Sequence, residues 1–352
     1  MCDIILTMLQ KLTMPAPKVS IVMPVYNIAN DIERSIDCLL TQTLKDFQVI
    51  IIDDASTDDT VKKIQRLVAD DDRFSIIKQA HCGPAAARNM GLQVATGETV
   101  IFLDGDDFFM PRLLEKTYQR YLHDSPDVVI FGWRSFNRKT QHLSANQQKT
   151  WPKDSQNIFS SRDLADKLFQ LTINSAWTQL YSRKYLIDNE ISFDETIETC
   201  NDGFFSMLSL ALAKKIVFIS DELLYYLYDR QGSISQKFNK GNVADNLYTL
   251  LRLKSKLTDL GVYQLYKKSF VKAMLDNTSY RLERCNDETK MLFKIELKKV
   301  LSQDVFDINR ESDNYLGDER YQNLYKYLLK YQPWHTQAKI LLKKLLAKTS
   351  FS

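Results

Sequence analysis

The fold is decided by residues 99–107, which read TVIFLDGDD. The first five of them are apolar or β-branched and predict a short buried strand at Thr99–Leu103. This strand runs directly into three aspartates, Asp104, Asp106 and Asp107, which share one turn with a glycine. Strands that are apolar throughout are typical of parallel sheets covered by helices on both faces. The stretch therefore predicts an α/β protein with carboxylates at the end of a strand.

The residues before this stretch alternate apolar runs with amphipathic segments. Such alternation predicts strands joined by crossover helices, and hence a mostly parallel central sheet. The carboxyl ends of the strands then meet in one crevice, where ligands bind. The predicted strands are Val19–Val25, Phe47–Ile52 and Phe74–Ile77, and the predicted helices are Asn30–Leu44, a segment that starts at Ser56, and Ala85–Val94.

The residues after this stretch divide the chain into regions. A strand is predicted at Val128–Phe131, the polar stretch Arg134–Ser155 predicts a long mobile loop, and the pattern from Asn239 onward is helical. We therefore predict a domain boundary near Gln236. The predicted regions are a leader at 1–17, an α/β domain at 18–235 with halves at 18–110 and 111–235, and an α-helical C-terminal region at 236–352.

The composition excludes the disordered and fibrous classes, because 44% of the 352 residues are hydrophobic and 26% are charged. The five cysteines are odd in number and lack the paired spacings of zinc or redox sites, which indicates reduced thiols. The first 14 residues have no basic leading segment or cleavage site, and no apolar run is long enough to cross a bilayer. We expect a cytoplasmic protein.

The charge is unevenly distributed along the chain. Residues 236–352 carry 22 Lys and Arg against 13 Asp and Glu, whereas the remainder carries 25 against 31. The last predicted helix, Thr336–Lys348, sets leucines against lysines. Such a helix either packs its apolar side onto the protein or lies on an anionic membrane, so peripheral contact with the inner face of the membrane is an open alternative.

Glycine-rich phosphate loops are absent from the sequence. The turn after the first strand, Pro24–Asn27, lacks the glycines that nicotinamide and flavin enzymes place against a pyrophosphate, and no Gly-Lys-Ser loop occurs. Asp104 and Asp106 offer another solution, because two carboxylates that flank one residue can hold Mn²⁺ or Mg²⁺ against phosphate oxygens. The alternative is a solvated acidic turn.

Four motifs occur in order between Pro17 and Pro111, and the similarity they carry covers roughly Lys18–Ile234. They read PKVSIVMPVYN, VIIIDDASTDDT, AAARNMG and GETVIFLDGDDFFMP. Together they closely resemble the family 2 glycosyltransferases of the GT-A fold. The resemblance implies an inverting, metal-dependent transferase that moves a hexose or N-acetylhexosamine from a nucleotide-sugar, expected to be UDP-linked, onto an acceptor hydroxyl. The implied acceptor is a glycan or lipid-linked molecule in surface polysaccharide or glycoconjugate synthesis, and no nucleic acid is involved.

The resemblance also assigns residues of the donor site, within the nucleotide-binding half at 18–110. By that resemblance, Tyr26 stacks on the donor base and Asp54 accepts its imide hydrogen bond. Arg88 lies near the base or the phosphates, and Asp106 is the direct metal ligand beside Asp104. The predicted donor-binding residues are Pro24, Tyr26, Asp54, Arg88, Asp104, Asp106 and Arg230.

Simple structural roles are the alternatives for four of these residues; for Arg230 the alternative is a charge at a strand end that meets no ligand. Tyr26 can cap the sheet, and Asp54 can cap the helix that follows it, a role that suits aspartate. Arg88 can form a surface ion pair, which contributes little to stability.

The resemblance places acceptor chemistry in the second half, 111–235. Relatives carry an acidic pair, usually Glu-Asp, at the start of a helix, and the sequence matches it as Asn201-Asp202. Asp202 is therefore the predicted catalytic base, while Asn201 departs from the usual Glu. Trp177 is predicted as a wall against the acceptor sugar. The alternatives are a helix N-cap for Asn201-Asp202 and a core position for Trp177.

Two rival functions are considered. A sugar nucleotidyltransferase needs a glycine-rich basic loop after the first strand, and Met23–Ile28 contains none. A non-catalytic nucleotide- or glycan-binding module is the rival from another class, and Asn201 is the feature that favours it.

Overall fold

The structure is a computed structural model that describes residues 16–137, 140, 142–144, 158–171, 175–197, 200–227 and 245–284. Contacts between Cα atoms divide the chain into two compact units. The first unit comprises residues 1–159, 175–195 and 213–229, and the second comprises residues 160–174, 196–212 and 230–352. The predicted boundary near Gln236 lies outside the described residues.

The first unit is built on one mixed sheet, with ten strands in the described part of the chain. The strand order is β3-β2-β1-β4-β9-β6-β10-β5, with β7 beside β6 and β8 beside β10. Parallel pairs join β1 to β2 and β4, β2 to β3, and β6 to β10, which confirms the predicted α/β class with a mostly parallel sheet. The strands are β1 Val19–Val25, β2 Phe47–Asp53, β3 Phe74–Lys78, β4 Thr99–Phe102, β5 Phe108–Phe109, β6 Val128–Asn137, β7 His142–Leu143, β8 Ile158–Phe159, β9 Gln179–Ser182 and β10 Ile216–Leu227.

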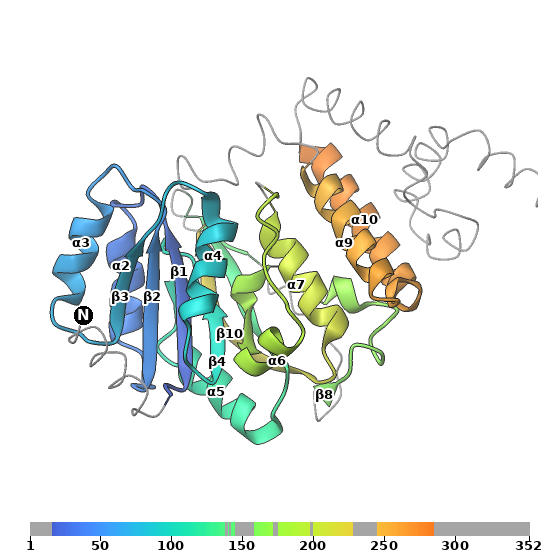
Figure 1. The fold of residues 1–352 in the computed structure, drawn as a ribbon, viewed down its shortest axis with the longest axis horizontal. Coiled ribbons are helices and arrows are strands. Elements are labelled where there is room, and N and C mark those ends of the chain that lie inside the picture. Colours follow the sequence, from blue (N-terminus) through green and yellow to red (C-terminus); the bar gives the residue numbers. More distant parts are fainter. Residues whose placement is uncertain are drawn as a thin grey trace, which may run out of the picture. The chain divides into compact units, whose positions relative to one another are not determined.

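Helices cover both faces of this sheet. Side chains along each strand alternate between the faces, so one strand contacts helices on both sides. Val19, Ile21 and Met23 of β1 share a core with apolar residues of α2, α3 and α5, whereas Val22 faces α4. A Cβ atom added to Gly91 of α4 lies 2.3 Å from Val22 Cγ1, so glycine allows α4 to approach the sheet closely (Figure 1). The helices of this unit are α2 Ile32–Leu40, α3 Thr60–Val68, α4 Gly83–Val94, α5 Leu113–Asp124, α6 Arg183–Asp188 and the short 3₁₀ helix η3 Ala176–Thr178.

Strand β6 is longer than the sequence pattern predicts. The predicted strand ends at Phe131, but β6 continues to Asn137 alongside the last residues of β10. The predicted loop is therefore wrong for residues 134–137, and residues 145–157 lie outside the described part. The polar pattern is misleading here because Arg134 is paired across the strands, with its Nε 2.6 Å from Glu222 Oε2.

The second unit is helical in its described residues. Its elements are η2 Leu168–Gln170, α7 Asn201–Leu212, α9 Asp245–Asp259 and α10 Tyr263–Arg284. The buried Tyr266 hydroxyl lies 2.8 Å from both the Ala211 carbonyl oxygen and Ser161 Oγ, which ties α10 to α7. The predicted helix Thr336–Lys348 lies outside the described residues, and within the described ones no helix is long and apolar enough to cross a membrane.

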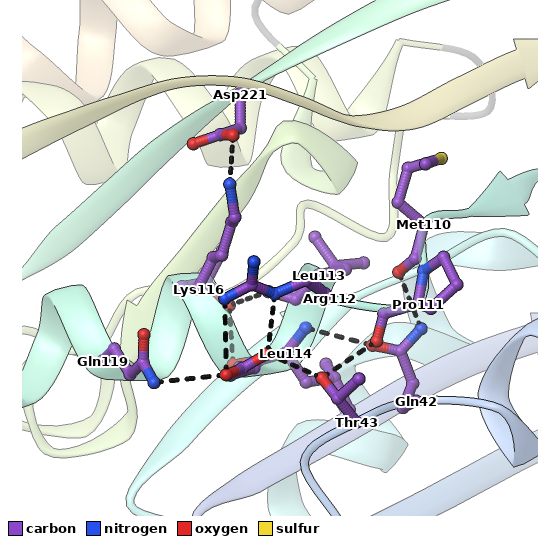
Figure 2. A network of polar contacts seen from close by, with 12 residues as sticks. Gln42, Thr43, Met110, Pro111, Arg112, Leu113, Leu114, Lys116, Gln119 and Asp221 are labelled. Atoms are coloured by element: carbon purple, nitrogen blue, oxygen red, sulfur yellow. Dashed lines mark hydrogen bonds and ion pairs between the residues drawn. The ribbon is translucent and has the colours of Figure 1, made fainter.

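Gln42 fastens the end of α2 to the start of α5. Its side chain is fully buried, and its Nε2 donates to the carbonyl oxygens of Cys38 at 3.0 Å and Met110 at 2.9 Å. Its Oε1 accepts from the backbone N–H of Leu114 at 3.1 Å, in the first turn of α5. Figure 2 shows this network beside the exposed Thr43, whose hydroxyl donates to Glu115 Oε2 at 2.8 Å.

We expect Gln42→Leu to lower the free energy of unfolding by about 1–3 kcal/mol, because it leaves the buried Leu114 N–H without its acceptor and removes one hydrogen bond from each of the Cys38 and Met110 carbonyl oxygens. Urea denaturation followed by tryptophan fluorescence measures this loss. Thr43→Ala is the matched control: it removes a hydrogen bond of the same network at the surface, where the loss is about 0.5 kcal/mol or less. Equal stability of the two variants contradicts the fastening role of Gln42.

Candidate active site

The carboxyl ends of β1, β2 and β4 meet at one edge of the sheet, as the sequence predicts. The three strands are parallel neighbours, with Val25 opposite Asp53 and Val22 opposite Phe102. Pro24 lies inside β1, opposite Ile52. Tyr26, Asp54 and the turn Asp104–Asp107 come within two residues of the ends of these strands and are therefore brought to the same edge.

The turn Asp104–Asp107 is held by the residues around it. A Cβ atom on Gly105 lies 2.6 Å from Ile28 Cδ1, so the glycine lets this turn pack tightly against the core. The Asp107 N–H donates to the Asp104 carbonyl oxygen at 3.2 Å. Arg34 Nη2 donates to the Asp106 carbonyl oxygen at 3.1 Å. These contacts hold the backbone of the turn and so fix the positions from which the aspartate side chains extend.

Asp107 is the buried member of the turn. Its Oδ1 accepts from the Leu227 N–H at the end of β10, 3.1 Å away, and its carbonyl oxygen accepts from Ser35 Oγ at 2.7 Å. Burial raises the pKa of Asp107 well above its ordinary value, and the negative charges of Asp106 and Asp104 raise it further. Asp107 therefore links α2 to β10, and the partly exposed Asp104 and Asp106 are the carboxylates that can meet a ligand.

Arg88 is paired with the first of these carboxylates. Its Nη2 lies 2.7 Å from Asp104 Oδ1, and its guanidinium carbon lies 5.4 Å from the centre of the Phe193 ring. The guanidinium side chain is buried, so the alternative of a surface ion pair is wrong. Asn89 holds the ring in place, because it accepts from the Phe193 N–H at 2.9 Å and donates to the Phe193 carbonyl oxygen at 3.0 Å.

Asp54 binds the turn that leads into α4. Its side chain accepts from Gln79 Nε2 at 2.7 Å, from the N–H groups of Cys82 at 2.8 Å and Gly83 at 2.9 Å, and lies 2.8 Å from His81 Nδ1. The alternative that Asp54 caps the helix that follows it, α3, is therefore wrong. The carboxylate binds the N–H groups of the N-cap residue Cys82 and of Gly83, the first residue of α4, and not those of α3.

Tyr26 stacks on a residue that the motifs did not indicate. Its ring centre lies 4.3 Å from that of His81, with 26° between the planes, and Tyr26 is 42% exposed. The available signal was the place of His81 in the sequence. A polar aromatic residue shortly after the third predicted strand reaches the same sheet edge as Tyr26 and Asp54.

Trp177 lies in the core of the first unit. It is 6% exposed, its ring stacks on Tyr226 at 5.3 Å, and Trp133 meets it edge-on at 5.2 Å. This burial favours the alternative of a core tryptophan over a wall for the acceptor. Arg230 lies outside the described residues.

Asn201 and Asp202 start helix α7 in the second unit. Asn201 is buried, and its Nδ2 lies 3.4 Å from the Ile197 carbonyl oxygen. Asp202 is partly exposed, and its Oδ1 accepts from the Gly203 N–H at 2.9 Å. The pair thus begins a helix, as predicted, and the carboxylate of Asp202 is the acidic group of the first turn.

The carboxylates of the turn suit a cation that is shared with a ligand. Among the described residues, no three His, Cys, Asp or Glu side chains group closely enough to hold a metal by themselves. Mg²⁺ and ions like it usually bind through one or two carboxylates and complete their shell with substrate phosphates and water. Asp104 and Asp106 provide such hard oxygen ligands, so the residues present fit a Mn²⁺ or Mg²⁺ site completed by a diphosphate.

The known proteins that this chain resembles in sequence are glycosyltransferases. Residues 20–189 match the sequence profile described as Glycosyl transferase family 2. The chain is 26% identical over 223 residues to glycosyltransferase GlyA of Streptococcus pneumoniae, which covers 62% of this chain but only 32% of GlyA. It is 25% identical over 322 residues to the cholesterol galactosyltransferase of Borreliella burgdorferi, covering 88% of this chain and 86% of that protein.

The fold also resembles solved structures. The crystal structure of S. aureus TarS 1–349 in complex with UDP-GlcNAc superposes with a TM-score of 0.70 at 20% sequence identity, covering 89% of this chain and 88% of TarS 1–349. At this identity the similarity describes the arrangement of strands and helices.

Proposed function

Because residues 20–189 belong to glycosyl transferase family 2 and adopt its GT-A fold, we propose that this protein transfers a sugar from a nucleotide-sugar to an acceptor hydroxyl. One observation carries the proposal: the exposed Tyr26 ring and the partly exposed carboxylates of Asp104 and Asp106 follow neighbouring strands at one sheet edge. UDP is the proposed nucleotide, in line with the ligand of TarS. A glycan or lipid-linked acceptor in surface polysaccharide synthesis is the proposed partner.

The donor site uses one aromatic residue and three charged ones. The Tyr26 ring offers its surface to the base, since stacking on an aromatic side chain suits any nucleobase. Asp104 and Asp106 would hold Mn²⁺ or Mg²⁺, and the cation would supply positive charge that stabilises a departing nucleoside diphosphate. Arg88 keeps the Asp104 carboxylate in place through its 2.7 Å ion pair. Pro24 and Arg230 remain proposed donor contacts.

The transfer itself needs one proton acceptor. In our proposal the carboxylate of Asp202 takes the proton of the acceptor hydroxyl, and the oxygen attacks the anomeric carbon opposite the diphosphate. A new carbon–oxygen bond forms while the bond to the diphosphate breaks, so the anomeric configuration inverts. Asp202 is the only carboxylate we assign to this step.

A panel of nucleotide-sugars tests the function. UDP-glucose, UDP-galactose, UDP-GlcNAc, UDP-GalNAc and GDP-mannose are each incubated with the protein, alkyl glycoside acceptors and Mn²⁺, and the released nucleoside diphosphate is measured. We expect one donor to be turned over and the turnover to stop when EDTA removes the cation. No release above background from any donor, with Mn²⁺ or Mg²⁺, contradicts the proposal.

A non-catalytic binding module is the second candidate, and the replacement of the usual Glu by Asn201 is the observation that favours it. However, Asn201 is buried and its amide bonds to Ile197 within the chain. Its position at the start of α7 therefore supports a structural role, which does not require loss of catalysis. Binding of UDP without turnover of any donor is the result that distinguishes this candidate.

A further inference from the structure

Arg88 holds the Asp104 carboxylate through one of its two oxygens. Arg88 Nη2 lies 2.7 Å from Asp104 Oδ1, and the Asp104 side chain is 26% exposed. Among the residues that the structure describes, Asp104 Oδ2 has no hydrogen-bond partner. Both oxygens of an ionised carboxylate can accept, so Oδ2 keeps its capacity to bind. The ion pair therefore sets the direction of the carboxylate and leaves Oδ2 for a ligand.

The guanidinium of Arg88 is in turn packed against an aromatic ring. Its central carbon lies 5.4 Å from the centre of the Phe193 ring, within the range of a cation–π contact. Arg88 is 7% exposed and Phe193 is 2% exposed, so the contact is shielded from water, where this attraction is strongest. The ring therefore restricts the positions that the long Arg88 side chain can take beside Asp104.

Phe193 is itself fixed from two sides. Asn89, the residue after Arg88 in α4, accepts from the Phe193 N–H at 2.9 Å and donates to the Phe193 carbonyl oxygen at 3.0 Å. The Phe193 ring meets the Phe102 ring edge-on, with 4.9 Å between centres. Phe102 is the last residue of β4, two residues before Asp104. Phe193 is thus tied both to the helix that carries Arg88 and to the strand that leads to Asp104.

We propose that Phe193 and Asn89 are positioning residues of the cation site. Phe193 holds the Arg88 guanidinium against Asp104 Oδ1, and Asn89 holds Phe193 in place, so Asp104 keeps an orientation in which Oδ2 is available to Mn²⁺ or Mg²⁺. Neither residue is a ligand, because the phenyl ring has no ligand atom and the amide is bonded within the chain. This inference rests on the proposed function and deepens it, since it names residues that set how tightly the cation is held.

Binding of Mn²⁺ to the full chain at saturating UDP tests the proposal, with free Mn²⁺ measured by electron paramagnetic resonance. Phe193→Leu keeps an apolar side chain but removes the aromatic face. We expect it to raise the Mn²⁺ concentration for half-saturation about three- to tenfold, the effect of losing one shielded cation–π contact. Half-saturation within about twofold of the parent protein overturns the inference.

Phe47→Leu is the matched control. Phe47 is 3% exposed, and the guanidinium carbon of Arg73 lies 4.4 Å from the centre of its ring. It is the first residue of β2, whereas the site lies at the other end of this strand. The substitution removes the same kinds of contact away from the site, so half-saturation stays within about twofold of the parent protein. A rise equal to that of Phe193→Leu overturns the inference, because it reports a general loss of packing.

Asn89→Ser tests the same role while leaving the Phe193 ring intact. Serine is too short to bond both backbone groups of Phe193, and it leaves room for water to satisfy them. We expect half-saturation by Mn²⁺ to rise about three- to tenfold, because the ring is released from α4. This variant decides the question also where Phe193→Leu does not fold. Binding of Mn²⁺ by Asn89→Ser as tight as in the parent protein overturns the role of Asn89.

A double-mutant cycle with Arg88→Ala separates positioning from a general structural role. Because Phe193 acts through Arg88, Phe193→Leu is expected to weaken Mn²⁺ binding in the parent protein but not in Arg88→Ala. An equal loss in both backgrounds overturns the positioning role. The proposed function fails separately: it fails when no nucleotide-sugar is turned over, whereas turnover with unaltered Mn²⁺ binding in Phe193→Leu removes only this inference.

Discussion

Replacing Asp106 by asparagine is expected to lower sugar transfer by about 10³-fold or more. The carboxylate is the proposed direct ligand of the cation at the leaving diphosphate. Such a cation stabilises the transition state by several kcal/mol, and each ~1.4 kcal/mol corresponds to about a tenfold change in rate. The neutral amide keeps the size of the side chain but loses its charge. Initial rates at saturating donor and Mn²⁺ measure the loss.

A binding measurement accompanies these rates. In the parent protein, Mn²⁺ is expected to tighten UDP binding, and in Asp106→Asn this dependence on Mn²⁺ disappears. Asp59→Asn is the control, because Asp59 is an exposed acid that forms a surface pair with Lys62 at 2.9 Å. Its rate stays within about twofold of the parent, as is usual for weak surface pairs. Full activity of Asp106→Asn rules out the metal site at this turn.

Replacing Asp202 by asparagine is expected to lower the turnover number by about 10²–10⁴-fold, the range that a positioned general base contributes. The amide has nearly the same shape but cannot take the proton of the acceptor hydroxyl. Because Asp202 is assigned to the acceptor and not to the donor, the dissociation constant of UDP stays within about twofold. Initial rates and calorimetry on the same preparation separate the two effects.

Asp245→Asn provides the comparison for this prediction. Like Asp202, Asp245 is an acidic residue in the first turn of a helix of the second unit, and it has no assigned role in transfer. Any loss from removing a negative charge at a helix N-terminus is common to both variants and costs about 0.3–1 kcal/mol of stability. Equal turnover of Asp202→Asn and Asp245→Asn eliminates Asp202 as the base.

Much of the first unit could be predicted from the sequence because its strands are continuous apolar runs. The predicted Val19–Val25 coincides with β1, and Phe47–Ile52 is one residue shorter than β2. Parallel strands buried on both faces need such runs, so the local pattern and the tertiary environment agree. The place of Tyr26, Asp54 and the acid turn follows from this, since each comes within two residues of the end of β1, β2 or β4.

The finer roles at the sheet edge could not be predicted, because they depend on partners distant in sequence. The Asp54 carboxylate accepts hydrogen bonds from the N–H groups of Cys82 and Gly83, which lie 28 and 29 residues further along the chain. His81 contacts that same carboxylate through Nδ1, and its stacking partner Tyr26 is the residue that follows β1. Local patterns report on faces and periods, whereas hydrogen-bond capacity is known only when all donors are in place.

The insertion of β9 into the middle of the sheet has a consequence for biosynthesis. Leu180 of β9 pairs with Ile101 of β4 on one side and with Val129 of β6 on the other, and it is antiparallel to both. While the chain emerges from the ribosome, the first four strands of the sheet can pair early, but the free side of β4 stays open for roughly 80 further residues. An open strand edge is a template for aggregation, so the edge of β4 can pair with other chains until β9 has been synthesised.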